Sequence, residues 1–327
     1  MSTAVQRVPA QSLPSDSQLA VAYSVCRGIT KTAAKNFYYA FLVLPPRKRQ
    51  ALYAVYAFMR RCDDIADDTG LTAHERRLKL GKWVEAFHQS QAGNPTDDPV
   101  QLALADAVRR FQIPPVLLDQ LAYGTAMDIE ERAVEGTNVF SAAGNLPPAE
   151  KPDVAPPLVY YKTFDDLYLY CYRVASVVGL VCIRIFGYRD SAAEALAERC
   201  GLAFQLTNII RDVKEDAAMD RVYIPQEDLT RFDIAPSELR AGKDIDRIRP
   251  LLAREADRAR EFYRSADELI PLINEDSQPA LWVLVTIYRR LLEKIAQRGF
   301  DVFKEKIQLT TREKLVVLGK GFLKRLA

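Results

Sequence analysis

The sequence predicts an all-α protein, and three observations support this prediction. Glycine accounts for only 14 of the 327 residues; it is costly in helix interiors, whereas alanine, leucine and arginine, which are plentiful here, are not. Apolar residues recur with the three- to four-residue spacing of amphipathic helices, and no run shows the alternation typical of a strand. Hydrophobic residues make up 49% and charged residues 27% of the chain, which is typical of a globular protein with a sizeable core.

Helical segments can be assigned in order along the chain, separated mostly by proline-containing breaks. We expect a disordered leader at 1–15, rich in Pro, Ser and Gln, followed by a single domain over 16–327. Residues 135–157 contain five prolines and no helical period, which predicts a long irregular insertion. About ten helices around one core are expected, the main ones at 16–41, 47–68, 72–90, 100–111, 115–133, 164–186, 192–216, 244–272, 279–298 and 311–327.

Charge and composition exclude several classes of function. With 45 basic and 43 acidic residues the net charge is +2, so no overall positive field indicates nucleic-acid binding. The two histidines and the five cysteines, which lack CxxC spacing, argue against a zinc site and predict reduced thiols in a cytoplasmic protein. The N-terminus does not resemble a signal peptide. The longest uncharged apolar stretch, at 175–183, is far shorter than a membrane span.

Two segments place carboxylates where amphipathic helices rarely carry them. RRCDDIADD puts Asp63 and Asp67 four residues apart, and QLTNIIRDVKED puts Asn208, Asp212 and Asp216 in one i, i+4, i+8 stripe. Like charges at this spacing destabilise a helix, and Asp is a poor helix former. A bound cation would offset the repulsion, and oxygen ligands without His or Cys favour Mg²⁺. Two such stripes facing each other would hold a diphosphate through bridging metal ions.

Other interpretations of these carboxylates exist. Either segment alone is compatible with a solvated acidic helix end. A helical scaffold would not need paired carboxylates on apolar helices, and a terpene cyclase with one substrate would not need two diphosphate sites. A di-iron bundle needs two ExxH elements, and only Glu85-x-x-His88 matches one.

Four longer segments make the chain resemble the squalene/phytoene synthase family of head-to-head prenyl transferases. They are CRGITKTAAKNFYYAFLVLP, AVYAFMRRCDDIADD, YCYRVASVVGL and FQLTNIIRDVKEDAAMDRVYIPQEDL. The resemblance covers nearly the whole chain, and it implies a single-domain, isoprenoid-synthase-type helical bundle around a central apolar cavity. It also implies Mg²⁺ as cofactor and prenyl diphosphates as substrates. The insertion at 135–157 is longer than is usual in this family.

The resemblance further implies roles for individual residues. The expected metal ligands are Asp63, Asp67, Asn208, Asp212 and Asp216. The residues expected to contact substrate are Asn36, Phe41, Tyr56, Arg60, Arg211, Tyr223, Tyr288 and Lys306. Tyr170 matches a tyrosine tied to the carbocation chemistry, the alternative being a core tyrosine in a stripe with Tyr168 and Tyr172. The family often has Ser in place of Asn36 and Arg in place of Lys306, and lysine offers a point charge instead of a planar fork.

The product expected from the resemblance is presqualene diphosphate, formed by 1'-1 condensation of two farnesyl diphosphates. Phe41 lies four residues after Phe37 on the same helical face, and in the family a bulky residue there can floor the cavity and exclude a further isoprene unit. The YCYRVASVVGL region also resembles bacterial presqualene-forming enzymes. Reduction on to squalene would need NADPH, and the chain carries no Gly-rich dinucleotide fingerprint. The alternative is a phytoene synthase that joins two geranylgeranyl diphosphates.

The last segment, TTREKLVVLGKGFLKRLA, combines basic residues with an apolar face. Such helices can lie on anionic lipid, although a core-packing helix with a solvated basic face has the same pattern. We expect a cytoplasmic enzyme that touches the inner face of a membrane peripherally and has downstream isoprenoid enzymes as partners. The residues of the predicted apolar face are Leu315, Val316, Leu318, Phe322 and Leu326.

Overall fold

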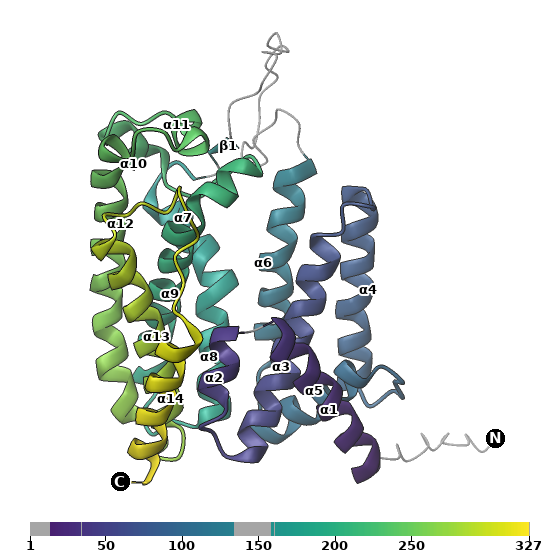
Figure 1. The fold of residues 1–327 in the computed structure, drawn as a ribbon. Helices are drawn as coiled ribbons and strands as arrows, with labels where there is room; N and C mark the ends of the chain where they lie inside the picture. Colours follow the sequence, from purple (N-terminus) through teal and green to yellow (C-terminus); the bar gives the residue numbers. More distant parts are fainter. Residues whose placement is uncertain (1–13, 34, 134–157, 160, 327) are drawn as a thin grey trace, which may run out of the picture.

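The computed structural model describes residues 14–33, 35–133, 158–159 and 161–326, and the structural statements below refer to these residues. Helices dominate this part of the chain, as predicted (Figure 1). All but the last two residues of the expected leader, and the whole expected insertion at 135–157, lie outside the described residues. The elements are α1 (Asp16–Ala33), α2 (Lys35–Phe41), α3 (Pro46–Ala66), α4 (Ala73–Gln91), α5 (Pro99–Phe111), α6 (Pro115–Ala133), β1 (Leu158–Val159), α7 (Phe164–Cys171), η1 (Tyr172–Ser176), α8 (Val177–Phe186), α9 (Ala192–Ala218), β2 (Arg221–Val222), α10 (Gln226–Arg231), α11 (Pro236–Ala241), α12 (Ile245–Leu269), η2 (Ile270–Leu272), α13 (Gln278–Gln297) and α14 (Thr311–Leu326).

Local sequence signals set many of the helix boundaries. At the start of α4 the Thr72 hydroxyl accepts the Glu75 N–H, while the Glu75 carboxylate accepts the Thr72 N–H at 2.8 Å. Thr163 and Asp166 form the same reciprocal pair at the start of α7. Each pair satisfies two donors that a helix N-terminus leaves without partners. Pro99 begins α5, where its missing N–H costs nothing.

Two predicted helices differ from the structure, and two short helices were not predicted. The helix expected at 16–41 is divided, because α1 ends at Ala33 and α2 begins at Lys35. The helix expected at 164–186 contains five residues of π-helix, η1, between α7 and α8. The short helices α10 and α11, of six residues each, were not predicted, because fewer than two turns carry too little periodicity to detect.

Two short strands are present in this helical fold, although no run of the sequence shows strand alternation. β1 and β2 pair in parallel, with Val159 opposite Val222. Each strand has two residues, which is too short to show alternation in the sequence. The contact continues beyond the strands, where the Gln226 N–H donates to the Tyr161 carbonyl at 2.9 Å. The strand pairing and this hydrogen bond together hold the residues before α7 against those that follow α9.

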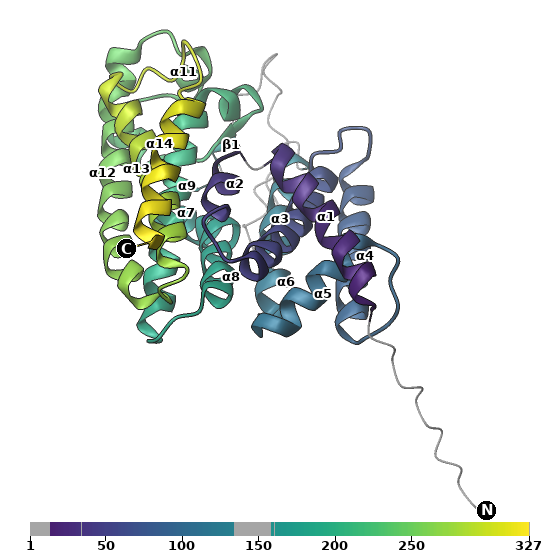
Figure 2. The same cartoon turned by 60° about the horizontal axis from the view of Figure 1, so that its bottom comes forward.

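The helices fall into two groups joined by two bridging helices. Figures 1 and 2 show α1, α3, α4, α5 and α6 on one side, and α9, α12, α13 and α14 on the other, with α2 and α8 between them. Helix α8 contacts α3 and α6 in the first group and α9 in the second, while α2 contacts α1 and α13. Buried apolar side chains from both groups form one continuous core. The two predicted acidic motifs, on α3 and α9, therefore belong to opposite groups.

Glycine allows the bridging segment to approach α9 closely. A Cβ at Gly201 would lie 2.6 Å from the Ser176 Cα and 2.8 Å from the Ala175 carbonyl oxygen, so a larger residue would push η1 away. The Ser176 hydroxyl also donates to the Glu198 carbonyl at 2.7 Å. This contact fixes the register of the 164–186 run against α9, and with it the position of Tyr170.

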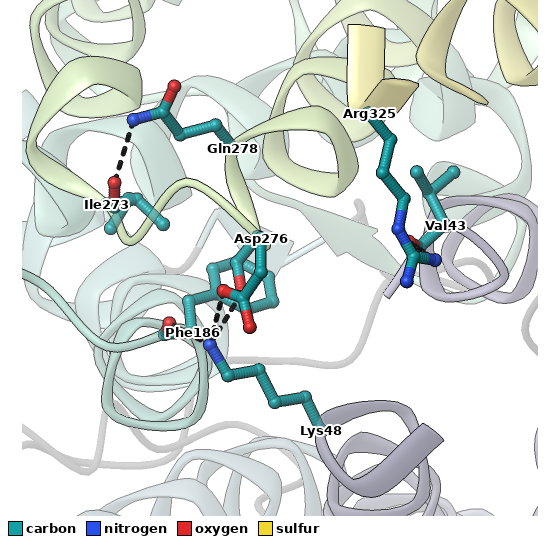
Figure 3. A network of polar contacts seen from close by, with 8 residues as sticks. Val43, Lys48, Phe186, Ile273, Asp276, Gln278 and Arg325 are labelled. Atoms are coloured by element: carbon teal, nitrogen blue, oxygen red, sulfur yellow. Dashed lines mark hydrogen bonds and ion pairs between the residues drawn. The ribbon is translucent and has the colours of Figure 1, made fainter. Parts of the chain in front are cut away.

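A polar network around Lys48 fastens one end of the bundle (Figure 3). The Lys48 ammonium lies 2.6 Å from the Phe186 carbonyl oxygen, 2.6 Å from the Asp276 carboxylate and 3.0 Å from the Ser277 hydroxyl. All three donors of the ammonium are therefore used. Because these partners belong to the end of α8 and the start of α13, the network ties α3 to both of them.

Among the described residues, one helical run is long and apolar enough to cross a membrane by length and composition, namely Phe164–Phe186. Half of its most apolar window is buried inside the protein. The run packs against α6 and α9. A helix in the core of a bundle passes the same test, so this run alone is weak support for a membrane span.

Candidate active site

The first acidic motif lies at the C-terminal end of α3. Asp63 is on the last turn, and Asp67 caps the helix, its N–H donating to the Asp63 carbonyl at 2.8 Å. Arg76 of α4, which is 8% exposed, donates from Nη1 to the Ala66 carbonyl at 2.8 Å. A cation is favourable here because the last carbonyls of a helix carry partial negative charge. The two carboxylates thus extend from a helix end that a buried arginine holds in place.

Tyr56 and Arg60 line the same face of α3, with Tyr56 about two turns and Arg60 about one turn before Asp63. Arg60 forms an ion pair of 2.6 Å with Asp64. Burial, assisted by the charge of Asp63 and opposed by Arg60, raises the pKa of Tyr56 to about 12. The Tyr56 hydroxyl therefore stays protonated at neutral pH and can donate a hydrogen bond.

The second acidic motif lies along the C-terminal half of α9. Asn208, Asp212 and Asp216 are all partly buried, which agrees with one shared helix face. The Arg211 Nε lies 2.8 Å from the Asp212 carboxylate, and the Lys306 ammonium lies 2.6 Å from it. Burial alone would raise the pKa of Asp212, but these two cations outweigh burial and hold it below its usual value. The structure thus brings Arg211 and Lys306 to the second motif, and their contact with a diphosphate stays a prediction.

The donor atoms near this motif suit a hard cation. The Asn208 Oδ1 and the Glu215 Oε2 are buried and have no hydrogen-bond partner in the described part of the chain. Such oxygens are the ligands that Mg²⁺ prefers. Across the described residues, no three His, Cys, Asp or Glu side chains converge closely enough to hold a metal ion. Asp212, already paired with two cations, would have to turn to join such a set.

Tyr288 of α13 lies between aromatic residues that neighbour the two motifs. Its ring stacks on Phe204 of α9 with 4.4 Å between ring centroids, and its centroid lies 6.0 Å from that of Phe37 on α2. Phe37 in turn lies 6.4 Å from Tyr56. Tyr288 also interacts electrostatically with both Tyr56 and Arg211. One buried tyrosine therefore touches the surroundings of the first motif and of the second.

Phe41 continues this series of aromatic contacts, next to the residue that ends it. Its ring centroid is 6.1 Å from that of Phe37 and 6.2 Å from that of Tyr53, and the residue is 3% exposed. The predicted alignment of Phe37 and Phe41 on one face is confirmed by their contact. The row runs from Tyr53 through Phe41 and Phe37 to Tyr288 and Phe204.

Tyr170 belongs to a second aromatic group, which we call the tyrosine triad: Tyr161, Tyr170 and Tyr223. Its ring centroid lies 5.0 Å from that of Tyr223 and 5.5 Å from that of Tyr161. All three are at most 6% exposed. Tyr170 is buried, as the alternative of a core tyrosine holds, but it shares no stripe with Tyr168, whose ring meets Phe164 and Phe262 and whose hydroxyl donates to Glu198. Residues two apart on a helix point in different directions.

Sequence reasoning missed three residues that lie near the predicted site. Tyr161 precedes α7 and Phe204 lies one turn before Asn208, so neither falls in an acidic motif. Glu215 was overlooked although it stands beside Asp216 in the same segment. The side chain of Asn36, in α2, lies outside the described residues. Its predicted role stays a prediction.

Two hollows are present on the described surface. One, of about 430 Å³, is lined by residues of α9 and α12, including Arg199 and Glu261. The other, of about 330 Å³, lies between α1 and the start of α5. Neither is lined by a predicted site residue. The central apolar cavity stays a prediction.

Comparison with known sequences gives a consistent result. Residues 30–313 match the family model described as squalene/phytoene synthase. A 15-cis-phytoene synthase of Synechococcus elongatus is 32% identical over 98% of both chains. A phytoene synthase of Mycobacterium tuberculosis is 35% identical over 90% of this chain and 89% of its own.

Comparison with solved structures identifies proteins with the same fold. A dehydrosqualene synthase in complex with a ligand superposes with a TM-score of 0.77 at 30% identity, over 93% of this chain and 96% of its own. The squalene synthase HpnC from Alicyclobacillus acidocaldarius gives a TM-score of 0.72 at 25% identity, over 88% and 97% of the two chains. The predicted isoprenoid-synthase-type helical fold is confirmed.

Proposed function

The chain belongs to the squalene/phytoene synthase family and is a prenyl transferase, and we propose that it joins two geranylgeranyl diphosphates head to head to form phytoene. The observation that carries the chemistry is Tyr288, whose ring lies between Phe37, which neighbours Tyr56, and Phe204, one turn before Asn208. A head-to-head condensation needs two diphosphates bound close together, and this junction is where two such sites would meet.

The choice of substrate rests on the relatives. Phytoene synthases from cyanobacteria and mycobacteria match this chain at 32–35% identity over at least 90% of its length. The expectation of farnesyl diphosphate, which came from the resemblance and from Phe41, has less support. We therefore place geranylgeranyl diphosphate first.

A second candidate is condensation of two farnesyl diphosphates to presqualene diphosphate. Its support is the likeness to a dehydrosqualene synthase at a TM-score of 0.77, together with the burial of Phe41 in the aromatic row, beside Tyr53. NADPH would enter only if this intermediate were then reduced to squalene. Formation of phytoene requires no reductant.

We propose that Asp63, Asp67, Asn208, Asp212 and Asp216 would hold Mg²⁺, with Glu215 as a further oxygen donor. The orphaned oxygens of Asn208 and Glu215 fit this role. When bound, Mg²⁺ would supply Lewis-acid stabilisation of negative charge on the diphosphate.

The cations of the chain itself would bind the diphosphates. Arg211 and Lys306 are held at the second motif by Asp212, and Arg60 by Asp64 near the first. A diphosphate carries more charge than one carboxylate and accepts charge-assisted hydrogen bonds from all three. The Tyr56 hydroxyl, protonated at neutral pH, would add a neutral donor.

Aromatic residues would protect the allylic cation left when a diphosphate departs. Such a cation must be kept from water, and aromatic faces attract positive charge. The tyrosine triad and the row from Phe41 to Tyr288 supply these faces. A proton is lost as the cyclopropane closes. Tyr170 is our candidate for the group that accepts this proton, and the departed diphosphate is the alternative acceptor. The hydrocarbon product would pass to enzymes that modify long isoprenoid chains.

Product analysis tests this proposal. The full chain is incubated with Mg²⁺ and either geranylgeranyl or farnesyl diphosphate, and the extracted lipid is identified by mass spectrometry. A higher kcat/KM for geranylgeranyl diphosphate with a forty-carbon hydrocarbon product supports the proposal. A preference for farnesyl diphosphate with a thirty-carbon product would replace it by the second candidate.

A further inference from the structure

The C-terminal helix α14 is apolar on two faces. Val317 and Leu318 point into the bundle and are at most 8% exposed. The outward side chains are nevertheless apolar as well. A surface helix of a globular protein normally turns a polar face to water. The outward apolar residues, with their exposed fractions, are Leu315 (51%), Val316 (48%), Phe322 (39%) and Leu323 (68%).

These four side chains form one patch, which we call the outer patch of α14. They lie at two adjacent positions and again seven residues later, which is about two helical turns, so they share a side of the helix. Of the eleven large apolar residues that are exposed in the described part of the chain, four lie in this patch. The sequence had placed Leu318 with Leu315 on one face, and this was wrong. The side chain of Leu326 lies outside the described residues.

The helix cannot bury the outer patch by rotating. A Cβ at Gly321 would lie 2.3 Å from the Val283 Cγ2 of α13, so α14 rests tightly on that helix. The Arg325 guanidinium donates to the Val43 carbonyl, just after α2, at 2.8 Å (Figure 3). At the other end, the Lys294 ammonium lies 2.9 Å from Glu313. Figures 1 and 2 both show α14 beside α13 and α2.

Basic residues flank the outer patch. Arg312, Lys320 and Lys324 are exposed, and Lys324 also lies over the Trp282 ring at 5.0 Å. The acidic residue of the helix, Glu313, is neutralised by Lys294. The patch therefore combines exposed apolar side chains with positive charge, which is the pattern of helices that lie in the surface of an anionic bilayer.

We propose that the outer patch of α14 docks this enzyme on an anionic lipid surface. A second copy is a poorer occupant, because a symmetric contact through the patch would bring the same lysines and arginine of two chains together. A lipid surface supplies the opposite charge. This inference goes beyond the proposed function and does not depend on which prenyl diphosphate is used.

Vesicle co-sedimentation of the full chain tests the proposal. We expect binding to vesicles of phosphatidylcholine with 30% phosphatidylglycerol, and weaker binding to phosphatidylcholine alone. Leu315→Gln/Leu323→Gln should reduce partitioning roughly tenfold or more, since two large apolar side chains are lost. Arg312→Gln/Lys320→Gln should reduce binding to the anionic vesicles by about fivefold per charge. The matched control is Leu78→Gln/Val116→Gln, which changes equally exposed residues on α4 and α6 and should bind like the wild type.

The proposal is overturned if the wild type does not bind anionic vesicles, or if the patch variant binds as well as the control. It is also overturned if light scattering shows a dimer that the patch variant converts to a monomer without lipid. Circular dichroism checks that each variant is folded. Turnover of detergent-dispersed substrate should be unchanged in the patch variant. Loss of lipid binding is thereby distinguished from failure of the proposed activity.

Discussion

The Lys306 ammonium lies 2.6 Å from the Asp212 carboxylate, so the segment before α14 reaches over to the second acidic motif on α9. Asp212 also accepts from Arg211. Two cations thus gather on one carboxylate, at the place where the resemblance implies a diphosphate. In the substrate-bound enzyme we expect both cations to turn to phosphate oxygens, which releases Asp212.

The Lys306 pair leads to a test of charge geometry. Lys306→Gln should raise KM for the prenyl diphosphate by about tenfold, because one charge-assisted contact is lost. Lys306→Arg should keep KM near the wild-type value, since the positive charge stays. Lys304→Gln is the control, because Lys304 is 82% exposed and pairs with Asp301. Steady-state kinetics checks this, and equal KM values for Lys306→Gln and Lys304→Gln would contradict the assignment.

Metal dependence can be tested at both motifs. Asp63→Asn and Asp212→Asn should each lower kcat by about 10²–10³-fold, comparable to loss of a key electrostatic stabiliser. Stability should change little for Asp63→Asn, since a like-charge pair at i, i+4 is relieved. Asp68→Asn, outside the i, i+4 pair, serves as control. Activity is measured against Mg²⁺ concentration, and turnover that persists in excess EDTA would remove the metal from the proposal.

Phe41 offers a test of chain-length selection. Phe41→Leu should raise kcat/KM for geranylgeranyl relative to farnesyl diphosphate, because the shorter side chain deepens the end of the aromatic row. Leu is preferred to Ala because complete truncation of a core Phe costs about 3–5 kcal/mol of stability. Phe87→Leu, equally buried but on α4, is the control. If both variants keep the wild-type ratio, Phe41 does not limit chain length.

Tyr161 should contribute to turnover through its ring. Tyr161→Leu removes an aromatic face from the tyrosine triad, and we expect a drop in kcat of about tenfold from the lost cation–π stabilisation. Tyr161→Phe keeps the face and should retain most of the activity. Single-turnover kinetics separates this effect from substrate binding. A Phe variant as impaired as the Leu variant would show that the hydroxyl, and not the ring, is required.

Stability should depend on pH through Glu255. Burial is the main cause that raises its carboxyl pKa to about 7, Asp228 adds to the shift, and Arg258 opposes it. Because the folded state then holds the proton more tightly than the unfolded chain, the free energy of unfolding falls as pH rises from 4.5 to 7. The full shift corresponds to about 3 kcal/mol.

Glu255→Gln should therefore flatten the decline of stability over this pH range. The measurement is urea unfolding at pH 5 and pH 7 for both proteins, comparing the two differences. The variant should also have a lower free energy of unfolding than the wild type when the values at the two pH points are averaged, since Arg258 loses a buried partner. A decline as steep as that of the wild type would rule out Glu255 as its source.

The sequence by itself determined the helices and the acidic stripes. Periodicity and capping act within a few residues, so the ranges of α3, α5, α9 and α13 follow from local order in the chain. The placement of Asp63 with Asp67 on one face follows from the same local geometry. The short elements β1, β2, α10 and α11 were not predicted, because they are too brief to carry a period. Packing against the rest of the chain stabilises them.

Tertiary structure alone decided which side chains from different helices meet. No spacing in the sequence brings Tyr288 between Phe37 and Phe204, puts Tyr161 on Tyr170, or pairs Lys306 with Asp212. Likewise, the apolar residues of α14 looked like one face, and only docking on α13 divided them into an inner side and an outer patch. A helix pattern fixes directions relative to its own axis, whereas the rotation of that axis against its neighbours is set by the packing of the whole bundle.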